Sequence, residues 1–587
     1  MNIGDSMQEL EWWQKAVFYQ IYPRSFADGN GDGIGDFHGM IDRLDYLRDL
    51  GVDALWLSPH YPSPIFDCGY DIAGYTAVAP EYGTLDDFER FLEGAHRRSI
   101  RVILDLVLNH TSDQHPWFIE SRSSRDNPRR DWYIWRDGKN GGPPNNWYSG
   151  FGDSAWEHDP ITGQYYYHYF FKQQPDLNWR NPKVRQTMWD VVRFWLNLGV
   201  DGFRLDAIGT IFEHPDLPDQ STGTALPDLR RALLVAGSKE EMERLAEQQK
   251  AMFQYQVEQP GMHELMQELR AVVDEYPDRV LVGETSEISY YGDGTNELHM
   301  AFNFPLMRTE KITPAWVRAN QQERLSALPT GAWPCNTLGN HDASRIYSHY
   351  GDGQNGNPLA RLHLALVLTL RGTPFLYNGE EIGMTDFSVE DVSQFRDNLS
   401  VWMYHTLVDE MGQSPEEALA LAVRLGRDKC RTPMQWANAP NGGFSPAGVQ
   451  TWLPVNHNYV QGINVAEQLG DPDSLLSFYQ RLLHVRKQAP ALVAGDYTPL
   501  HEDAEDYFAF LRHSPSLSSP SMEETEQENG QTCLVVLNMS EHTHTLRFDL
   551  DASTTRLIFS SQTRDGGTDD LSQLAIAPFE VYIGEIV

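Results

Sequence analysis

The feature that most constrains the fold is a repeated alternation between short apolar runs of β type and amphipathic helical patterns. Helical patterns cover 41–51, which ends at a glycine, and 84–99. This alternation is typical of βα units around a parallel sheet. Eight strands are enough to close a ring, so the sequence predicts an α/β fold with a (β/α)8 TIM barrel. The strand candidates are VFYQIYP (17–23), ALWLSP (54–59), VILDLVLNH (102–110), GFRLDA (202–207), VLVGET (280–285), AFNFPL (301–306), CNTLGNHD (335–342) and TPFLYNGEE (373–381).

Several long segments interrupt or extend this barrel. Residues 111–182 are rich in Trp, Tyr, Gly, Asn and Pro, which predicts a subdomain inserted after strand 3. From about residue 495 the pattern is alternating and β-rich, which predicts an antiparallel β-sandwich domain. Its low-complexity segment, 514–531, is expected to be a disordered loop. The predicted domains are 1–110 (barrel, first part), 111–182 (inserted subdomain B), 183–494 (barrel, second part, with helical insertions near 226–260 and 386–450 and a last helix at 475–488) and 495–587 (C-terminal β domain).

Charge and composition exclude several classes of partner. The net charge is −37, so nucleic acid and anionic membrane surfaces are poor partners. No apolar run approaches the roughly 20 residues that span a bilayer, and the N-terminus lacks the basic and apolar segments of a signal peptide. We therefore expect a cytoplasmic protein. The four cysteines are far apart with no CxxC spacing, so we expect neither a zinc cluster nor a disulfide framework.

Three carboxylates stand where predicted strands run out into loops: Asp206, Glu284 and Asp342. A parallel barrel collects side chains from the carboxyl ends of distant strands into one site. Because a pair of carboxyl groups around one pocket is what glycosidic bond cleavage needs, the trio predicts a sugar-processing enzyme.

The neighbours of these carboxylates suggest different roles. Arg204 lies two residues before Asp206 and points to the same face of a strand, which favours an ionised nucleophile. Glu284 has no basic neighbour in the sequence, which favours a raised pKa and a general acid. Asp342 follows His341 and is expected to bind sugar hydroxyls and stabilise positive charge in the transition state.

Four short motifs carry a resemblance to a known family: DLVLNH (105–110), GFRLDA (202–207), VGET (282–285) and GNHD (339–342). In order and spacing they resemble the α-amylase family, glycoside hydrolase family 13. The resemblance runs from about residue 12 to about residue 490. Further motifs resemble its α-glucosidase and oligo-1,6-glucosidase branch: VFYQIYPRSF (17–26), CGYDIAGY (68–75), QPDLNW (174–179), RGTPFLYNGEEIGM (371–384) and RTPMQW (431–436).

The resemblance implies a retaining double displacement, with Asp206 as nucleophile, Glu284 as general acid and base, and Asp342 holding the distorted sugar. It also implies an exo-acting enzyme that releases one glucose at a time. The substrate-binding residues that it implies are Asp71, His110, Arg204, His341 and Arg345; Asp71 and Arg345 match the pair that receives the terminal glucose. Asp105 and Asn109 are interpreted as mainly structural.

The loop ADGNGDGIGD (27–36) has oxygen-bearing side chains at alternate positions. Such spacing suits a hard cation, although an acidic, glycine-rich turn would explain it as well. It is not an EF-hand, because Gly39 takes the place of the final Glu. A matching loop in the α-glucosidase branch binds calcium, so the resemblance implies a structural Ca²⁺ and no organic cofactor. The predicted ligands are Asp28, Asn30, Asp32, the carbonyl of Ile34, and Asp36.

The sequence constrains the substrate less closely. Ala207 follows the nucleophile, and a small residue there tends to accompany α-1,4 cleavage or sucrose and trehalose chemistry, whereas α-1,6-cleaving members carry Val. We therefore expect hydrolysis of short α-glucosides (maltose, malto-oligosaccharides, with sucrose a further candidate), with transglycosylation as a side activity. A trehalose synthase-like maltose isomerase and an oligo-1,6-glucosidase are the alternatives.

Non-catalytic transporter heavy chains share this barrel but have a membrane span and lack the carboxylates. The oligomeric state stays open, and the 226–260 insertion is either a wall of the acceptor side or an oligomer contact.

Overall fold

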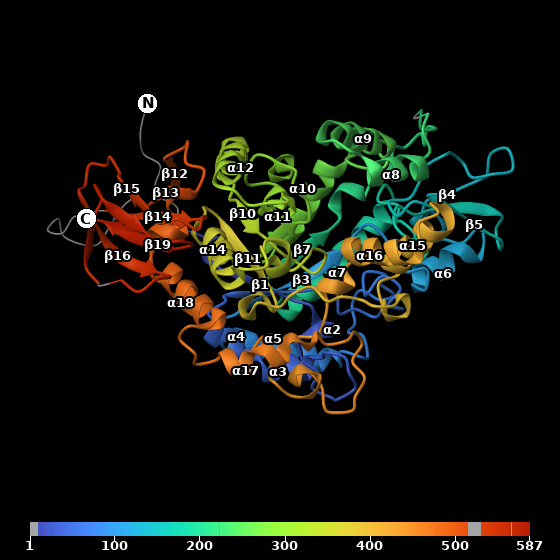
Figure 1. Cartoon of the computed structure of the whole chain (residues 1–587). Coiled ribbons are helices and arrows are strands. Elements are labelled where there is room, and N and C mark those ends of the chain that lie inside the picture. Colours follow the sequence, from blue (N-terminus) through green and yellow to red (C-terminus); the bar gives the residue numbers. More distant parts are fainter. Residues whose placement is uncertain (1–9, 222, 515–529, 565) are drawn as a thin grey trace.

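Figure 1 shows the computed structural model of the chain, which describes residues 10–221, 223–514, 530–564 and 566–587. The predicted disordered loop at 514–531 lies, apart from its ends, outside the described residues. No helix in the described ranges is long and apolar enough to cross a membrane.

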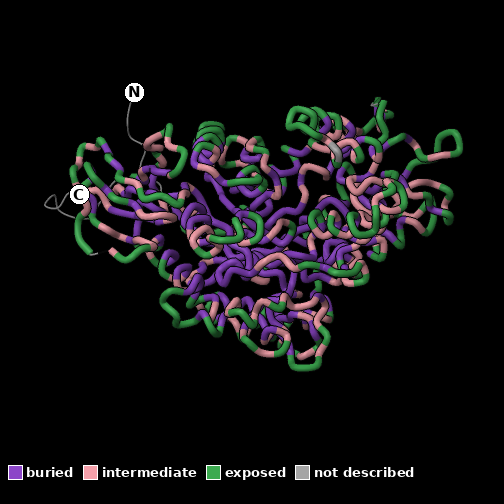
Figure 2. Tube along the Cα trace, in the orientation of Figure 1, coloured by how far each residue is buried: buried purple, intermediate pink, exposed green. Residues whose placement is uncertain are grey.

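An eight-stranded parallel sheet in the order β10-β11-β1-β2-β3-β7-β8-β9 forms the centre of the molecule. A parallel bridge between Phe302 and Cys335 joins its two outer strands, so the sheet is a nearly closed barrel and the prediction is confirmed. All strand residues but Arg101 are buried, as Figure 2 shows for the core, because helices cover a parallel sheet. The strands are β1 (Phe18–Ile21), β2 (Ala54–Leu57), β3 (Arg101–Val107), β7 (Gly202–Asp206), β8 (Val280–Gly283), β9 (Met300–Ala301), β10 (Cys335–Thr337) and β11 (Thr373–Tyr377).

The helices around the barrel begin and end at residues that satisfy their free backbone groups. Thr84 and Asp87 form a capping box at the start of α5, and Gly51 and Gly199 end α4 and α7 in the left-handed conformation. The helices are α1 (Trp12–Lys15), α2 (Pro23–Phe26), α3 (Phe37–Asp42), α4 (Leu44–Leu50), α5 (Leu85–His96), α7 (Pro182–Leu198), α10 (Met262–Val273), α11 (Phe304–Arg308), α12 (Pro314–Ala327), α13 (Ile346–His349), α14 (Gly356–Thr369), α17 (Val465–Gln468), α18 (Leu475–Gln488) and α19 (Pro490–Ala494).

Two predicted elements differ from the structure. The predicted helix at 41–51 is two helices, α3 and α4, that meet at Arg43, whose φ of −103° and ψ of 3° interrupt the helical geometry. The predicted strand at 301–306 is wrong after its first residue, because β9 ends at Ala301 and Pro305 lies in the first turn of α11. Proline supplies no backbone donor to a sheet but suits the start of a helix.

Three segments after barrel strands lie together at the side away from the C-terminal domain (Figure 1). The first, between β3 and α7, contains a three-stranded antiparallel sheet in the order β4-β6-β5. The second, after β7, contains α8 and α9, and the third, after β11, contains α15, a π-helical turn and α16. Their bounds are α6 (Pro116–Ser123), β4 (Trp135–Arg136), β5 (Trp156–Asp159), β6 (Gln164–Tyr167), α8 (Leu226–Val235), α9 (Lys239–Met252), α15 (Asn398–His405), the π-helical turn Thr406–Glu410, and α16 (Pro415–Leu425).

The C-terminal part consists of two antiparallel sheets. A six-stranded sheet has the order β12-β13-β14-β19-β16-β17, and β15 pairs with β18. Side chains of both sheets, including Leu534, Val536, Leu546 and Ile576, form one buried cluster, which agrees with the predicted sandwich. The strands are β12 (Asp496–Leu500), β13 (Tyr507–Ser514), β14 (Gln531–Asn538), β15 (His544–Leu546), β16 (Thr554–Ser560), β17 (Thr568–Asp570), β18 (Leu574–Ile576) and β19 (Val581–Ile586).

Candidate active site

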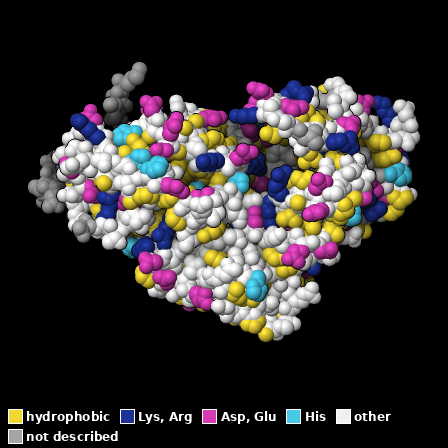
Figure 3. Space-filling view, in the orientation of Figure 1, with side chains coloured by type: hydrophobic (Ala, Val, Ile, Leu, Met, Phe, Trp, Pro, Cys, Tyr) yellow, Lys and Arg dark blue, Asp and Glu magenta, His cyan; other side chains and the backbone are white. Residues whose placement is uncertain are grey.

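A cavity of about 440 Å³ lies at the carboxyl ends of the barrel strands, and all three predicted catalytic carboxylates line it. Figure 3 shows the face hollowed beside the segment with α8 and α9, with charged side chains near the rim. The cavity draws its lining from the barrel loops and from all three added segments. The lining residues that bear on its chemistry are Asp67, Tyr70, His110, Phe151, Asp206, Ala207, Glu258, Glu284, Glu287, Arg308, Asp342 and Arg427.

Arg204 holds the carboxylates on the barrel axis. The register of β3 and β7 places it beside Asp105, and Asp206 lies two residues further along the same strand. Its Nη1 is 2.6 Å from Asp105 Oδ1 and 2.7 Å from Asp206 Oδ1, and its Nη2 is 2.8 Å from Glu284 Oε2. The backbone N–H of Ala207 also donates to Glu284 Oε2, at 2.9 Å. Glu284 therefore has a basic neighbour in space although it has none in the sequence, because β7, which carries Arg204, pairs with β8, which leads to Glu284. The less charged setting expected for Glu284 is wrong.

Burial governs the protonation of these groups. It raises the pKa of Asp206 to about 7, that of Glu284 to about 7 and that of Asp105 to about 6, against the lowering effect of Arg204. One guanidinium thus faces three buried carboxyl groups. Because neighbouring carboxylates repel one another, the three do not all ionise near neutral pH, and their titration belongs to the cluster.

Asp342 is in a different electrostatic setting. Its Oδ1 is 2.5 Å from Arg431 Nη2 and 3.9 Å from Arg427 Nη1. Burial would raise the pKa of Asp342, but the neighbouring positive charges, of which those of Arg431 and Arg427 are permanent, hold it well below its usual range. Burial also lowers the pKa of His341 far below its usual value, so that imidazole is neutral and the two guanidiniums supply the positive charge. Asp342 is ionised at neutral pH.

The two predicted histidines lie beside the carboxylates. His341 Nδ1 is 2.7 Å from Gln20 Nε2, and its Nε2 is 2.6 Å from the hydroxyl of Tyr70, which donates to Asp105 Oδ2 at 2.9 Å. Since the amide of Gln20 donates, Nδ1 accepts and Nε2–H donates to Tyr70. His110 lines the cavity, and burial lowers its pKa to about 4, so it is a neutral polar group there.

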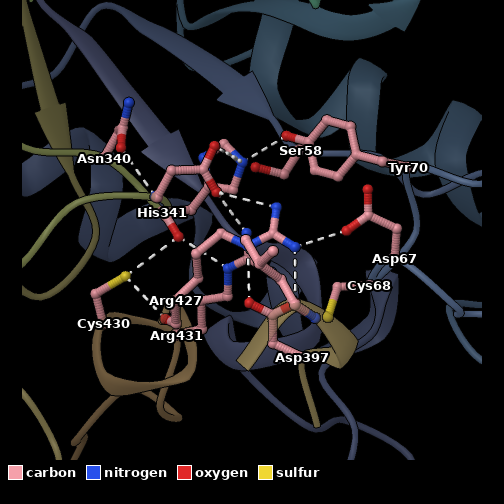
Figure 4. A network of polar contacts seen from close by, with 12 residues as sticks. Ser58, Asp67, Cys68, Tyr70, Asn340, His341, Asp397, Arg427, Cys430 and Arg431 are labelled. Atoms are coloured by element: carbon pink, nitrogen blue, oxygen red, sulfur yellow. Dashed lines mark hydrogen bonds and ion pairs between the residues drawn. The ribbon is translucent and has the colours of Figure 1, made fainter. Parts of the chain in front are cut away.

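An acidic and basic pair in the cavity lining is Asp67 with Arg427 (Figure 4). Arg427 Nη2 is 2.6 Å from Asp67 Oδ1 and 2.7 Å from Asp397 Oδ1, and Arg427 Nε donates to Asp397 Oδ2 at 2.8 Å. Gln174 donates to the other oxygen of Asp67 at 2.9 Å. The guanidinium is thus fixed between two carboxylates and turned toward Asp342.

The predicted pair of Asp71 and Arg345 does not lie in the cavity, which corrects its expected position. Asp71 is fully buried and accepts hydrogen bonds from Ser63 Oγ and from the backbone N–H groups of Phe66 and Asp67. Arg345 is also buried; it donates to the carbonyl of Asn378 and lies 4.4 Å from the centre of the Tyr377 ring. Asp71 stabilises the turn that presents Asp67. The motif at 68–75 contains Asp71, and Asp67 directly precedes it, so only the fold of that turn distinguishes the two aspartates.

The predicted calcium loop is closed by its own hydrogen bonds. Asp28 Oδ1 accepts from the N–H of Gly31 at 2.6 Å, and Asp36 caps α3 by accepting from Gly39 N–H at 2.7 Å. Asn30 Nδ2 is 3.2 Å from Asp32 Oδ2. Across the described part of the chain no three His, Cys, Asp or Glu side chains are grouped to hold a metal. A cation in this loop would therefore also need the amide oxygen of Asn30 and the carbonyl of Ile34, both hard oxygen donors.

Comparison with known proteins places this site in a family. Residues 20–495 match the family model of the alpha-amylase catalytic domain. The chain belongs to the α-amylase family, and the protein is a glycoside hydrolase.

Relatives of known function match over most of their length. The oligo-1,6-glucosidase of Parageobacillus thermoglucosidasius is 40% identical, over 98% of this chain and 99% of that protein. The trehalose-6-phosphate hydrolase of Bacillus subtilis is 39% identical, over 86% of this chain and 88% of that protein. Among solved structures, the trehalulose synthase of Pseudomonas mesoacidophila superposes with a TM-score of 0.85 at 36% identity, covering 99% of this chain and 100% of that one.

Proposed function

We propose that the protein is a retaining, exo-acting α-glucosidase that hydrolyses short α-glucosides such as maltose and malto-oligosaccharides. Small α-glucosides are therefore its proposed partners, and sucrose is a further candidate substrate. The observation that carries the proposal is the sharing of Arg204 by Asp206 and Glu284, which lie 2.7 Å and 2.8 Å from its two terminal nitrogens. A retaining mechanism needs a nucleophile and an acid close together, with carboxyl groups about 5–5.5 Å apart.

The proposed chemistry uses one proton and one ionised carboxylate. Asp206 attacks the anomeric carbon and forms an ester while Glu284 gives its proton to the departing oxygen. Glu284 then takes a proton from water, which attacks the anomeric carbon and releases Asp206. The shared guanidinium supports this starting state, because three buried carboxyls around one positive charge favour keeping one proton among them.

We infer the exo mode from Asp67 and Arg427 in the cavity lining. Asp67 and Arg427 offer fixed acceptor and donor groups to the hydroxyls of a terminal glucose, and Asp342 offers a second carboxylate. Ion pairs that hold Arg427 between Asp67 and Asp397 leave its orientation little freedom. A chain continuing past that sugar would have to displace these contacts, so we propose that glucose is removed from the non-reducing end.

Sugar isomerisation is the second candidate, since the structural neighbours include a trehalulose synthase and an isomaltulose synthase. The same glucosyl ester would serve it, and retention of the released sugar in place of water would decide the product. An oligo-1,6-glucosidase would differ from the proposed enzyme only in the glycosidic linkage that it cleaves. Ala207, which lines the cavity, leaves room beside the scissile oxygen and is our reason to put α-1,4 linkages first.

A product time course by NMR on maltose, isomaltose, sucrose and trehalose, each supplied separately, tests the proposal. We expect α-glucose to appear before its mutarotation, fastest from maltose, and no turnover by Asp206→Asn, because an amide cannot form the ester. β-Glucose as the first product would disprove retention. Maltose converted to trehalose with little free glucose would identify an isomerase.

We further propose that the loop 27–36 holds a structural Ca²⁺, through the side chains of Asp28, Asn30, Asp32 and Asp36 and the carbonyl of Ile34. Its alternate oxygen donors support this, and its distance in sequence from the carboxylates argues for a structural ion. Such an ion would stabilise the folded chain without entering the reaction, so its removal should change the melting temperature.

A further inference from the structure

The segment inserted after β7 returns to the active-site cavity at one residue, Glu258, which lines the cavity together with the catalytic carboxylates. Its backbone N–H donates to the carbonyl of Gly209 at 2.7 Å, which ties the end of the insertion to the turn behind the nucleophile. Its φ is +54°, a left-handed conformation that a glutamate adopts at some cost in free energy. Such backbone strain concentrates at functional sites because the surrounding structure imposes it.

Buried side chains on both sides of Glu258 hold it in this position. Gln256 is fully buried and lies 3.0 Å from the hydroxyl of Tyr167. Gln259 is buried too, and its amide donates to the carbonyls of Gln254 and Val257 at 2.7 Å and 2.9 Å. The side chain of Glu258, in contrast, is exposed to the cavity. The segment therefore buries the two flanking amides and leaves one carboxylate exposed to the cavity.

The two oxygens of this carboxylate differ. Oε2 accepts a hydrogen bond from the hydroxyl of Tyr290, on the loop that follows Glu284. Oε1 lies beside Gly209, where a Cβ would come within 2.3 Å of it. Within the described part of the chain, Oε1 accepts no hydrogen bond from a side chain or from the backbone. It is an acceptor without a protein partner, on a residue that lines the cavity.

We propose that Glu258 determines specificity by accepting a hydrogen bond from a hydroxyl of the leaving-group sugar. This inference rests on the proposed function. Glu284 protonates the departing oxygen, and Thr285, Ser286 and Glu287 follow it along the cavity wall, so the contact with Tyr290 places Glu258 on the leaving-group side. In the proposed function, Asp67 and Arg427 bind the terminal glucose instead. A carboxylate only accepts hydrogen bonds and a sugar hydroxyl donates them, which makes the pair complementary.

The test compares two substrates that share the glucosyl group and differ in the leaving group. Maltose releases a sugar with hydroxyls, and p-nitrophenyl α-glucoside releases a phenol that offers none to Glu258. For Glu258→Ala we expect the ratio of kcat/KM for maltose to kcat/KM for the aryl glucoside to fall about tenfold, the equivalent of one charged hydrogen bond. Glu258→Gln, which keeps a carbonyl acceptor, should recover part of that ratio. The matched control is Glu247→Ala. Glu247 is an exposed residue of α9 in the same insertion, and its replacement should leave the ratio unchanged.

The outcomes separate this inference from the proposed function. Equal losses on both substrates would show that Glu258 acts only through the structure of the site. Full activity of Glu258→Ala on both substrates would show that it does not contact the leaving group. Either result overturns the inference and leaves the α-glucosidase proposal standing. Wild-type protein that cleaves neither substrate would overturn the proposed function and this inference with it.

Discussion

At the scale of single residues, Arg204 organises the site. Its guanidinium contacts Asp105, Asp206 and Glu284, and it lies 5.0 Å from the centre of the Trp56 ring. A lysine would offer a point charge in place of this planar fork and could not hold three carboxylates in the same orientation. The protonation of the catalytic pair is thus a property of the cluster and not of either acid alone.

The pH dependence of kcat/KM follows from this cluster. Burial raises the pKa of Glu284 to about 7, and Glu284 must carry a proton to act as the acid. Burial raises the pKa of Asp206 to about 7 as well. We therefore expect kcat/KM for maltose to pass through a maximum at about pH 7, falling above it as Glu284 loses its proton and below it as the nucleophile becomes protonated. Rates measured from about pH 4 to about pH 9 test this. A profile that stays flat from about pH 6 to about pH 9 would contradict Glu284 as the acid.

At the scale of elements, close packing between β7 and β8 positions the two catalytic carboxylates. Gly202 pairs with Val280 in parallel register, with a φ of +154°. A Cβ on Gly202 would lie 2.1 Å from the carbonyl oxygen of Val280, a contact that only movement of the backbone could relieve. The first residue of β7 therefore controls how closely the strand that carries Asp206 approaches the strand that carries Glu284.

Gly202→Ala should lower the free energy of unfolding by roughly 2–3 kcal/mol, through strain and displaced backbone. Denaturant unfolding measures the change. Gly237→Ala is the matched control, because Gly237 is exposed, has no positive φ and has no heavy atom within 4 Å of the position that a Cβ would occupy; it should stay within about 0.5 kcal/mol of wild type. Equal stability of the two variants would show that β7 and β8 can move apart without lowering the free energy of unfolding.

At the scale of the whole molecule, the loop 27–36 joins distant parts of the chain. Asp28 N–H donates to the carbonyl of Phe444 at 3.3 Å, and Trp452 N–H donates to the carbonyl of Gly33 at 3.0 Å. Ser445 also donates its hydroxyl hydrogen to Asp28. The loop thus connects the start of the barrel to the segment after β11, which also carries Arg427.

Removal of calcium should lower the melting temperature, because an ion that binds only the folded state stabilises it by about 2.7 kcal/mol at a hundredfold excess over its Kd. The measurement is a thermal scan after chelation and exhaustive dialysis, with and without added Ca²⁺. Metal analysis of the untreated protein is the control. Protein that holds no calcium and shows no shift would refute the proposed ion.

The site was partly predictable because some of its residues are placed by local pattern. A run such as GFRLD must be a buried strand, and its register then brings Asp105, Arg204 and Asp206 together. The pairing of Asp67 with Arg427 was not predictable in this way, because 360 residues separate them and because Asp71, in the neighbouring motif, competes with Asp67 for the role. Glu258 belongs to no motif, and only its position in the cavity lining identifies it as a candidate site residue.

The sequence by itself determined the barrel, the C-terminal β domain and the three central carboxylates, since strand and helix periodicity and residues at strand ends are local properties of the chain. The tertiary structure alone decided which aspartate faces the cavity, which arginine meets it, that Glu284 shares Arg204, and that the insertion after β7 ends at the cavity. These are contacts between segments far apart in the chain, and they depend on how loops pack against one another, which periodicity does not encode.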